Sequence, residues 1–169
     1  MKKIFILITV FSTFLNGRLS YGQGISQPVS ARLSVKSFIS MKINKSQNID
    51  FKFNSTEQME QGITKPNAFN VEIKTNQNWN LSVSSLTPNF LALGPDSQTL
   101  LPSSILGLRK SNTSSFISVA QNPVSLATGG RGSSTNGQNQ FNLDLKATPG
   151  LNFDGGSFTL VVIFTVSPQ

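Results

Sequence analysis

The sequence of 169 residues predicts an all-β protein, an antiparallel β-sandwich of about seven to nine strands. Hydrophobic residues recur at every second position in most of its apolar segments, which is typical of strands with one buried face. Glycine, proline and asparagine separate these segments at short intervals, as in a sandwich of short strands. After residue 22 no segment predicts a helix.

The longest alternation of apolar and polar residues runs from Val29 to Ile43. It predicts one long amphipathic strand, or two strands joined by a bend near Ser37. A second alternation follows at residues 49–53, with the apolar positions Ile49, Phe51 and Phe53. Residues 55–68 contain a glycine and a proline, and we expect them to form a connection.

Residues 69–75 and 79–83 give the clearest pair of strands in the sequence. Each alternates strictly, and the polar residues 76–78 separate them, so a β-hairpin is predicted. Trp79 lies on the apolar face of the second strand with Leu81 and Val83, which predicts a core position for the only tryptophan.

The second half of the chain contains shorter apolar segments, at residues 90–93, 105–108, 116–119, 124–126 and 141–145. Residues 128–140 lack apolar residues and are expected to form a mobile loop. The last strand, Phe158 to Val166, is apolar on both faces. Such a strand is expected in the interior of a sheet and not at a solvated edge.

Residues 1–22 have the pattern of a signal peptide, which leaves residues 23–169 as a single β-sandwich domain. Lys2 and Lys3 precede an apolar stretch, residues 4–15, that is too short to span a bilayer as a helix. The small residues Ser20 and Gly22 predict cleavage after Gly22, within a residue or two. The alternative is a membrane anchor that is retained.

The composition excludes most kinds of reactive centre. The chain contains no histidine and no cysteine, so the commonest general base, the commonest transition-metal ligand and the thiol nucleophile are absent. The seven acidic residues show no paired pattern of catalytic carboxylates, and the turn at Asp154–Gly156 is a weak calcium motif. We expect no enzyme activity, no cofactor and no metal ion.

The charge distribution argues against nucleic-acid binding. Loss of residues 1–22 would leave eleven basic and seven acidic residues, a net charge of +4. The basic residues are scattered and form no run longer than two, whereas a nucleic-acid binder concentrates its charge. No apolar run beyond the leader is long enough for a transmembrane helix.

Two stretches carry a resemblance to a known family: Ile49 to Ser85, and the glycine-led final strand GGSFTLVVIFTVSPQ. With the exported character of the chain, they resemble small exported pilin-like, spore-coat-U-like β-sandwich proteins. The resemblance implies an immunoglobulin-like, pilin-like fold and a subunit of a chaperone–usher surface fibre or coat. The chain departs from many such pilins because it lacks their disulfide. Trp79-Asn80-Leu81 is also similar to the WxL motif of cell-wall-binding surface domains.

The same resemblance implies assembly by β-strand addition, in which one subunit supplies a strand that its neighbour lacks. The candidate donor is Gly24 to Lys36, with the alternating residues Val29, Ala31, Leu33 and Val35. The candidate groove edge is the final strand, with Phe158, Leu160, Val162, Phe164 and Val166. The alternative is that Val29 to Val35 pairs within its own chain.

These observations favour a non-enzymatic, exported structural or adhesive surface subunit, of fimbrial or coat type. Its expected partners are other subunits or surface proteins, with a chaperone and usher implied by the resemblance. Its expected location is the periplasm, the cell surface or the medium. One alternative is a cell-surface binding module for a glycan, the cell wall or a protein. Another is a small outer-membrane β-barrel, because the alternation and the length permit eight strands.

Overall fold

A computed structural model describes residues 26–94, 100–134 and 138–169. The predicted signal peptide and its cleavage site lie outside the described residues. The chain divides into two units, Met1–Val35 and Lys36–Gln169. In the first unit, residues 26–35 are exposed and have no regular secondary structure.

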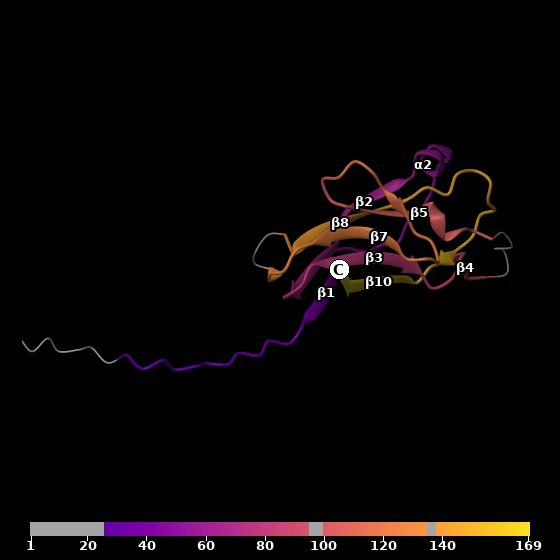
Figure 1. Ribbon diagram of the computed structural model, residues 1–169. Coiled ribbons are helices and arrows are strands. Elements are labelled where there is room, and N and C mark those ends of the chain that lie inside the picture. The colour runs from indigo at the N-terminus through magenta and orange to yellow at the C-terminus, as the bar shows by residue number, and fades with distance from the viewer. Residues whose placement is uncertain (1–25, 95–99, 135–137) are drawn as a thin grey trace, which may run out of the picture. The chain divides into compact units, whose positions relative to one another are not determined.

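Among the described residues of the second unit, the regular structure is mainly strand, with the short helix α2 and the 3-10 turn η1 (Figure 1). Its elements in chain order are β1 (Ile39–Lys45), α2 (Thr56–Gln61), β2 (Ile63–Thr75), β3 (Trp79–Ser85), β4 (Leu91–Ala92), η1 (Ser103–Ile105), β5 (Leu106–Lys110), β6 (Ile117–Ser118), β7 (Val124–Gly129), β8 (Gln140–Ala147), β9 (Phe158–Thr159) and β10 (Val162–Pro168).

The strands form two principal sheets and a short ribbon, and all the pairs are antiparallel. The larger sheet has the order β1-β2-β8-β5-β6, the smaller has the order β10-β3-β7, and β4 pairs with β9. In Figure 1, β2, β8 and β5 lie in one layer and β3 and β10 in the other. The predicted antiparallel, all-β sandwich is therefore confirmed.

Alternate residues of the central strands fill the space between the two sheets. Trp79, Leu81 and Val83 of β3 are fully buried, as are Val71 and Ile73 of β2. Leu108 of β5 and Leu143 of β8 complete the innermost layer. The two-residue period seen in the sequence is thus the period at which side chains point into this core.

Trp79 is the largest fully buried side chain, and its predicted core position is confirmed. Its ring stacks on Phe141 of β8, with ring centroids 6.0 Å apart and an interplanar angle of 6°. Its Nε1–H donates to Asn139 Oδ1 at 3.0 Å and to the Gly130 carbonyl at 3.1 Å. Asn139 is itself buried, and its carbonyl oxygen accepts from the Ile73 amide at 2.8 Å. Because Trp79 belongs to one sheet and Phe141 and Ile73 to the other, these contacts join the two layers.

The predicted hairpin of residues 69–83 is wrong. β2 pairs with β1 and β8, whereas β3 pairs with β10 and β7, so residues 76–78 carry the chain from one sheet to the other. Alternation shows only that a strand has one buried face, and a hairpin and a crossover present the same pattern. The partner is decided by contacts that are distant in the sequence.

The predicted interior position of the last strand is also wrong. The segment is divided into β9 and β10, and β10 lies at the edge of the smaller sheet. The second apolar face of the segment Phe158 to Val166 is exposed to solvent, with Val161 55% and Ile163 38% exposed. The residues that suggested burial on both faces are therefore surface residues in the single chain.

Regular structure at the N-terminal side differs from the prediction as well. The first strand begins at Ile39, and residues 26–38 form no strand. Residues 49–53 form no strand either, although Ile49, Phe51 and Phe53 pack against the core.

The expected connection at residues 55–68 contains α2 and the start of β2. The Ser55 hydroxyl accepts from the Gln58 amide, and Gln58 Oε1 accepts from the Asn54 amide. These two bonds resemble a capping box, a local signal for the start of a helix. β2 begins at Ile63 and is irregular between Lys65 and Phe69, where Pro66 has no amide hydrogen to donate.

The contact between Gly129 and Trp79 gives a test of the core. A Cβ at position 129 would lie 2.6 Å from Trp79 Cε2, and the fully buried indole ring has little room to move. We expect Gly129→Ala to lower the free energy of unfolding by about 1–3 kcal/mol and to shift the emission of the only tryptophan. Urea unfolding followed by fluorescence measures both.

Gly155→Ala is the matched control, because a Cβ there meets no atom within 4 Å. Equal stability of the two variants would show that the close approach of Gly129 to the indole is unimportant.

Candidate assembly edge

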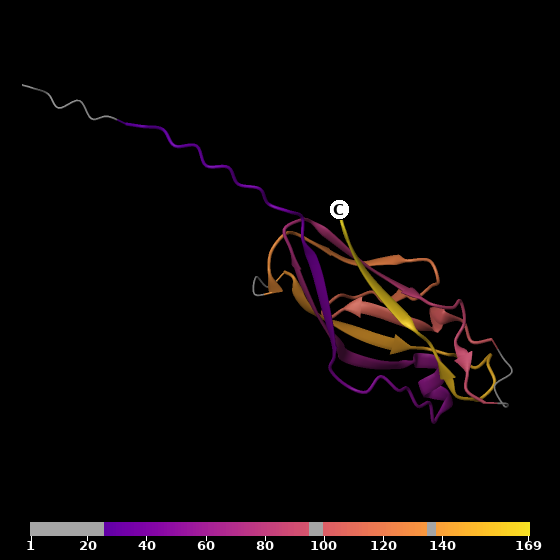
Figure 2. The same cartoon turned by 90° about the horizontal axis from the view of Figure 1, so that it is seen from below.

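The candidate functional feature is the side of the sandwich bounded by β1 and β10, which we call the open edge. β1 is the last strand of the larger sheet and β10 is the last strand of the smaller sheet. The two strands contact each other, and they converge near the C-terminus of the chain (Figure 2). Each therefore has one side on which its backbone amides and carbonyls have no strand partner among the described residues.

The inward residues of both strands are only half-buried. They are Ile39, Met41 and Ile43 on β1, and Val162, Phe164 and Val166 on β10. All six pack against the buried core, and the Phe164 ring meets Phe69 edge to face at 5.6 Å. The central strands β2 and β3 bury the equivalent positions completely. The core is thus less well covered at the open edge than at the central strands.

Three of the five residues predicted for the groove edge, Val162, Phe164 and Val166, lie together on β10. Leu160 is half-buried between β9 and β10, and Phe158 lies on β9, where it pairs with Ala92 of β4. The contribution of β1 was not predicted. Ile39 to Ile43 was expected either in one strand with Val29 or in a second strand after a bend near Ser37, and neither alternative gave it a place in the groove. The alternation was visible, but nothing in the sequence indicates which strands lack a neighbour.

The predicted donor residues lie in the part of the first unit that the structure describes. Val29 is 90% exposed, Leu33 88% and Val35 72%, and Ala31 is also exposed. None of them belongs to a strand. Large apolar side chains at two-residue spacing are therefore presented to solvent, which is unfavourable for an isolated chain.

β10 also lacks the features that normally protect an edge strand. Natural edges carry charged residues, bulges or proline that discourage pairing with another chain. The sequence of β10, VIFTVSP, contains no charged residue, and its single proline stands at the end. Its register with β3 is regular from Val162 to Pro168. β10 is therefore chemically suited to accept a further strand.

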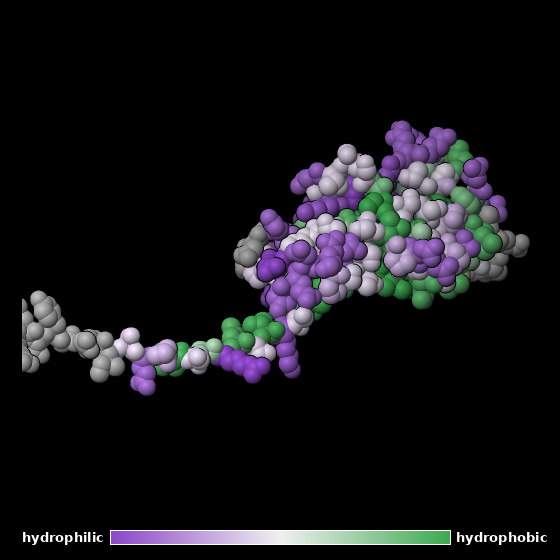
Figure 3. Space-filling model, in the orientation of Figure 1, coloured by the Kyte–Doolittle hydropathy of each residue, from purple (hydrophilic) through white to green (hydrophobic). Residues whose placement is uncertain are grey.

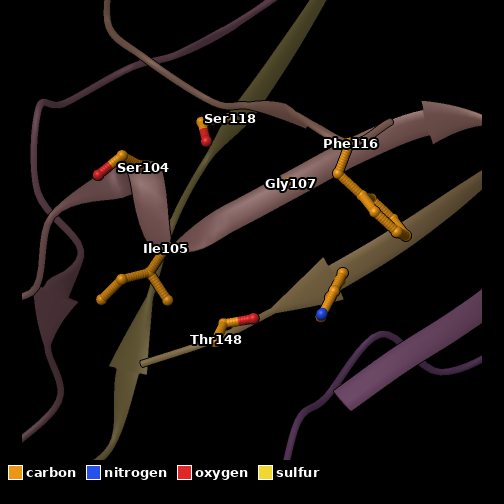
Figure 4. A pocket seen from close by; sticks show the side chains of 7 residues that line it. Ser104, Ile105, Gly107, Phe116, Ser118 and Thr148 are labelled. Carbon is orange, nitrogen blue, oxygen red and sulfur yellow. The ribbon is translucent and has the colours of Figure 1, made fainter. Parts of the chain in front are cut away.

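A hollow on the larger sheet is a second candidate site (Figure 4). It is lined by Ser104, Ile105, Gly107, Phe116, Ser118, Lys146 and Thr148. The Arg109 guanidinium lies 4.3 Å from the Phe116 ring centroid, so one face of the only aromatic ring in the hollow is already occupied. Sugar-binding sites usually present a free aromatic face, and the hollow gives the glycan alternative little support.

The described residues contain no group of three or more acidic side chains that could hold a metal ion. Among these residues, none of the helices is long and apolar enough to cross a membrane.

The buried carboxylate of Asp144 is the strongest electrostatic feature of the described residues. It is 4% exposed and accepts hydrogen bonds from the Asn67 amide at 2.9 Å, Ser111 Oγ at 2.6 Å and Arg109 Nε at 3.0 Å. Burial raises the pKa of Asp144, but the bonds from Ser111, Asn67 and Arg109 and the guanidinium charge outweigh it and lower the pKa below the ordinary value. The hydrogen bonds of Asp144 hold strands of the larger sheet together, because they link β8 to β5 and to the irregular part of β2.

Comparisons with known proteins give no family assignment. No protein-family model matches the sequence, and no curated protein matches it. The solved structures that are similar to it include two from pili. A structure of a chaperone–usher pilus has 15% identity and a TM-score of 0.40, covering 89% of this chain and 98% of the other. The P pilus rod subunit PapA has 14% identity and a TM-score of 0.41, covering 79% of this chain and 99% of the other.

The Asp144 network predicts a loss of stability on neutralisation. Asp144→Asn should lower the free energy of unfolding at pH 7 by about 2–3 kcal/mol, because three donors lose a charged acceptor. A carboxyl whose folded pKa is lowered stabilises the protein above its unfolded pKa, about 3.9, and this contribution disappears as the pH falls through the folded pKa. The difference between wild type and variant should therefore shrink in acid, as measured by urea unfolding between pH 7 and pH 2.

Glu60→Gln, which changes an exposed carboxylate on α2, should have little effect at any pH. A difference between Asp144→Asn and wild type that stays constant down to pH 2 would contradict the assignment to the charged form.

Proposed function

We propose that the protein is a structural subunit of a surface assembly, joined to its neighbours by β-strand addition. The observation that carries the proposal is the open edge, where two strands that are each paired on one side only flank an incompletely covered core. An added strand would satisfy the backbone groups along the edge and cover the half-buried side chains. No reactive centre is needed for this function.

The proposed donor is the segment Gly24–Lys36 of a neighbouring copy. Val29 to Val35 spans seven positions with apolar residues at alternate places, and β1 and β10 are each seven residues long. At about 3.3 Å per residue, the donor and the edge both extend about 20 Å. Their side chains also complement each other, since both present apolar groups at two-residue spacing.

The location and the accessory partners follow from the same proposal. A signal peptide at residues 1–22 would export the chain to the periplasm, the cell surface or the medium. Before assembly the open edge would be prone to pairing with any available strand. A chaperone that covers this edge, and an usher that directs assembly, are therefore proposed partners.

A second candidate function, binding of a protein partner, is favoured by an exposed apolar patch around β4. Its residues are each more than half exposed: Leu86, Leu91, Leu93, Leu100 and Val161. The Leu86 amide donates to the Val161 carbonyl at 3.0 Å, and Leu91 pairs with Thr159, so distant segments converge there. Figure 3 shows hydrophobic surface at this end of the second unit.

Substituting Leu91 and Leu100 by aspartate should leave self-assembly intact under the main proposal, whereas a protein-binding module would lose its partner.

Removal of the donor tests the main proposal. We expect deletion of residues 24–36 from the mature protein to leave a folded domain, because residues 26–35 contribute no strand to it. The protein that lacks residues 24–36 should remain monomeric under conditions in which the wild type forms ladders on a native gel. Unfolding of the monomer on deletion would remove the support for strand addition.

A pair of point variants makes the test sharper. Leu33→Asp places a charge on the apolar face of the donor, and Ser34→Asp places the same charge on its opposite, polar face. Leu33→Asp should reduce assembled material more than tenfold, since an unpaired charge would be buried, while Ser34→Asp should assemble like wild type. Equal behaviour of the two variants would contradict an ordered added strand.

A further inference from the structure

The residues immediately before β1 are held by the connection between β2 and β3. Asn76 Oδ1 accepts from the Phe38 amide at 2.8 Å, and Asn76 Nδ2 donates to the Lys36 carbonyl at 2.7 Å. The Asn76 amide donates to the Phe38 carbonyl at 3.2 Å, and Gln77 Nε2 donates to Ser37 Oγ at 2.8 Å. Each residue from 36 to 38 therefore has a bond to Asn76 or Gln77.

These bonds continue the ladder of β1 beyond its last strand pair. Ile39 pairs with Thr75, so Phe38 is the next residue opposite Asn76. The Asn76 side chain supplies the acceptor and the donor that a further residue of β2 would have supplied from its backbone. Lys36 to Phe38 are thus held as an extension of β1, although the β2 chain has already turned toward β3.

The two clamping residues are themselves fixed. The Gln77 amide donates to Thr75 Oγ1 at 3.0 Å, and Thr75 Oγ1 donates to the Gln77 carbonyl at 3.3 Å. Thr75 is buried, and its backbone exchanges two hydrogen bonds with Gly132, at 3.0 and 2.8 Å. Thr75 and Gln77 are therefore fixed on either side of Asn76, and the side chains of Asn76 and Gln77 are left for residues 36–38.

We infer that Asn76 and Gln77 form a clamp that directs the donor segment to a second copy of the chain and away from its own open edge. The inference rests on the proposed function. To lie beside β1 or β10 of its own domain, the segment ending at Val35 must reverse its direction close to Lys36, because that is where it joins β1. A reversal requires turn geometry at residues 36–38, and turn geometry breaks the bonds to the clamp. An incoming segment from another copy has no such restriction.

Chemical cross-linking tests this inference, because the chain contains no cysteine of its own. Ser34→Cys and Ile163→Cys place thiols on the exposed faces of the donor and of β10, so no inward apolar contact is removed. A short bismaleimide then joins the donor either to its own β10 or to that of a neighbour. Denaturing gels separate the two products, a monomer with an internal link and a ladder.

With the clamp intact, we expect mainly ladders. With Asn76→Ala and Gln77→Ala added, we expect the fraction of internally linked monomer to rise at least about fivefold at low protein concentration. Asn70→Ala is the matched control, because it removes a nearby asparagine, on β2, whose side chain bonds to Asn142 and not to residues 36–38. A purely structural role of the clamp would change the urea midpoint without changing the ratio of internal to intermolecular links.

The failures of the two proposals can be distinguished. If ladders form, and the ratio of internal to intermolecular links is the same in the clamp variant and in wild type, the inference about the clamp is wrong. Strand addition would still stand. Absence of both products in every variant would overturn strand addition, and the clamp would fall with it.

Discussion

The sandwich depends on the contacts of Trp79, which fix how its two sheets pack against each other. The indole stacks on Phe141 of the opposite sheet, and its only polar atom donates to the buried Asn139 and to Gly130. A buried indole nitrogen needs an acceptor, and Asn139 in turn is fixed by the bond between its carbonyl and Ile73. Close approach of Gly129 completes the enclosure. Without cysteine, no covalent link can replace these contacts.

This central packing contrasts with the side of the sandwich bounded by β1 and β10. β2, β3 and β8 have strand neighbours on both sides, whereas β1 and β10 have a neighbour on one side only. Their inward residues remain half-buried, and residues 26–35 present a complementary series of apolar side chains without a partner among the described residues. The domain thus combines a well-ordered interior with an edge whose hydrophobic and hydrogen-bonding groups are incompletely satisfied. The proposed strand addition would satisfy both.

The candidate site was predictable in part. The alternation of Val29 to Val35 and of Val162 to Val166 marked both as strand-forming segments with an apolar face. Their exposure was not predictable, because the same alternation describes a strand that is paired on both sides. The role of β1, the separation of β9 from β10, and the bonds from Asn76 to residues 36–38 depend on neighbours 24 or more residues away in the chain.

The sequence by itself determined the class of the fold, the buried faces of β2, β3 and β8, the core position of Trp79 and the absence of histidine and cysteine chemistry. These properties are local, because a two-residue period follows directly from strand geometry and a composition needs no fold to be read. The tertiary structure decided that β2 and β3 belong to different sheets and that β10, a largely apolar strand without charged residues, lies at an edge. The physical reason is that strand pairing is made by backbone groups, which every residue except proline carries alike, so the choice of partner depends on how all the strands pack together.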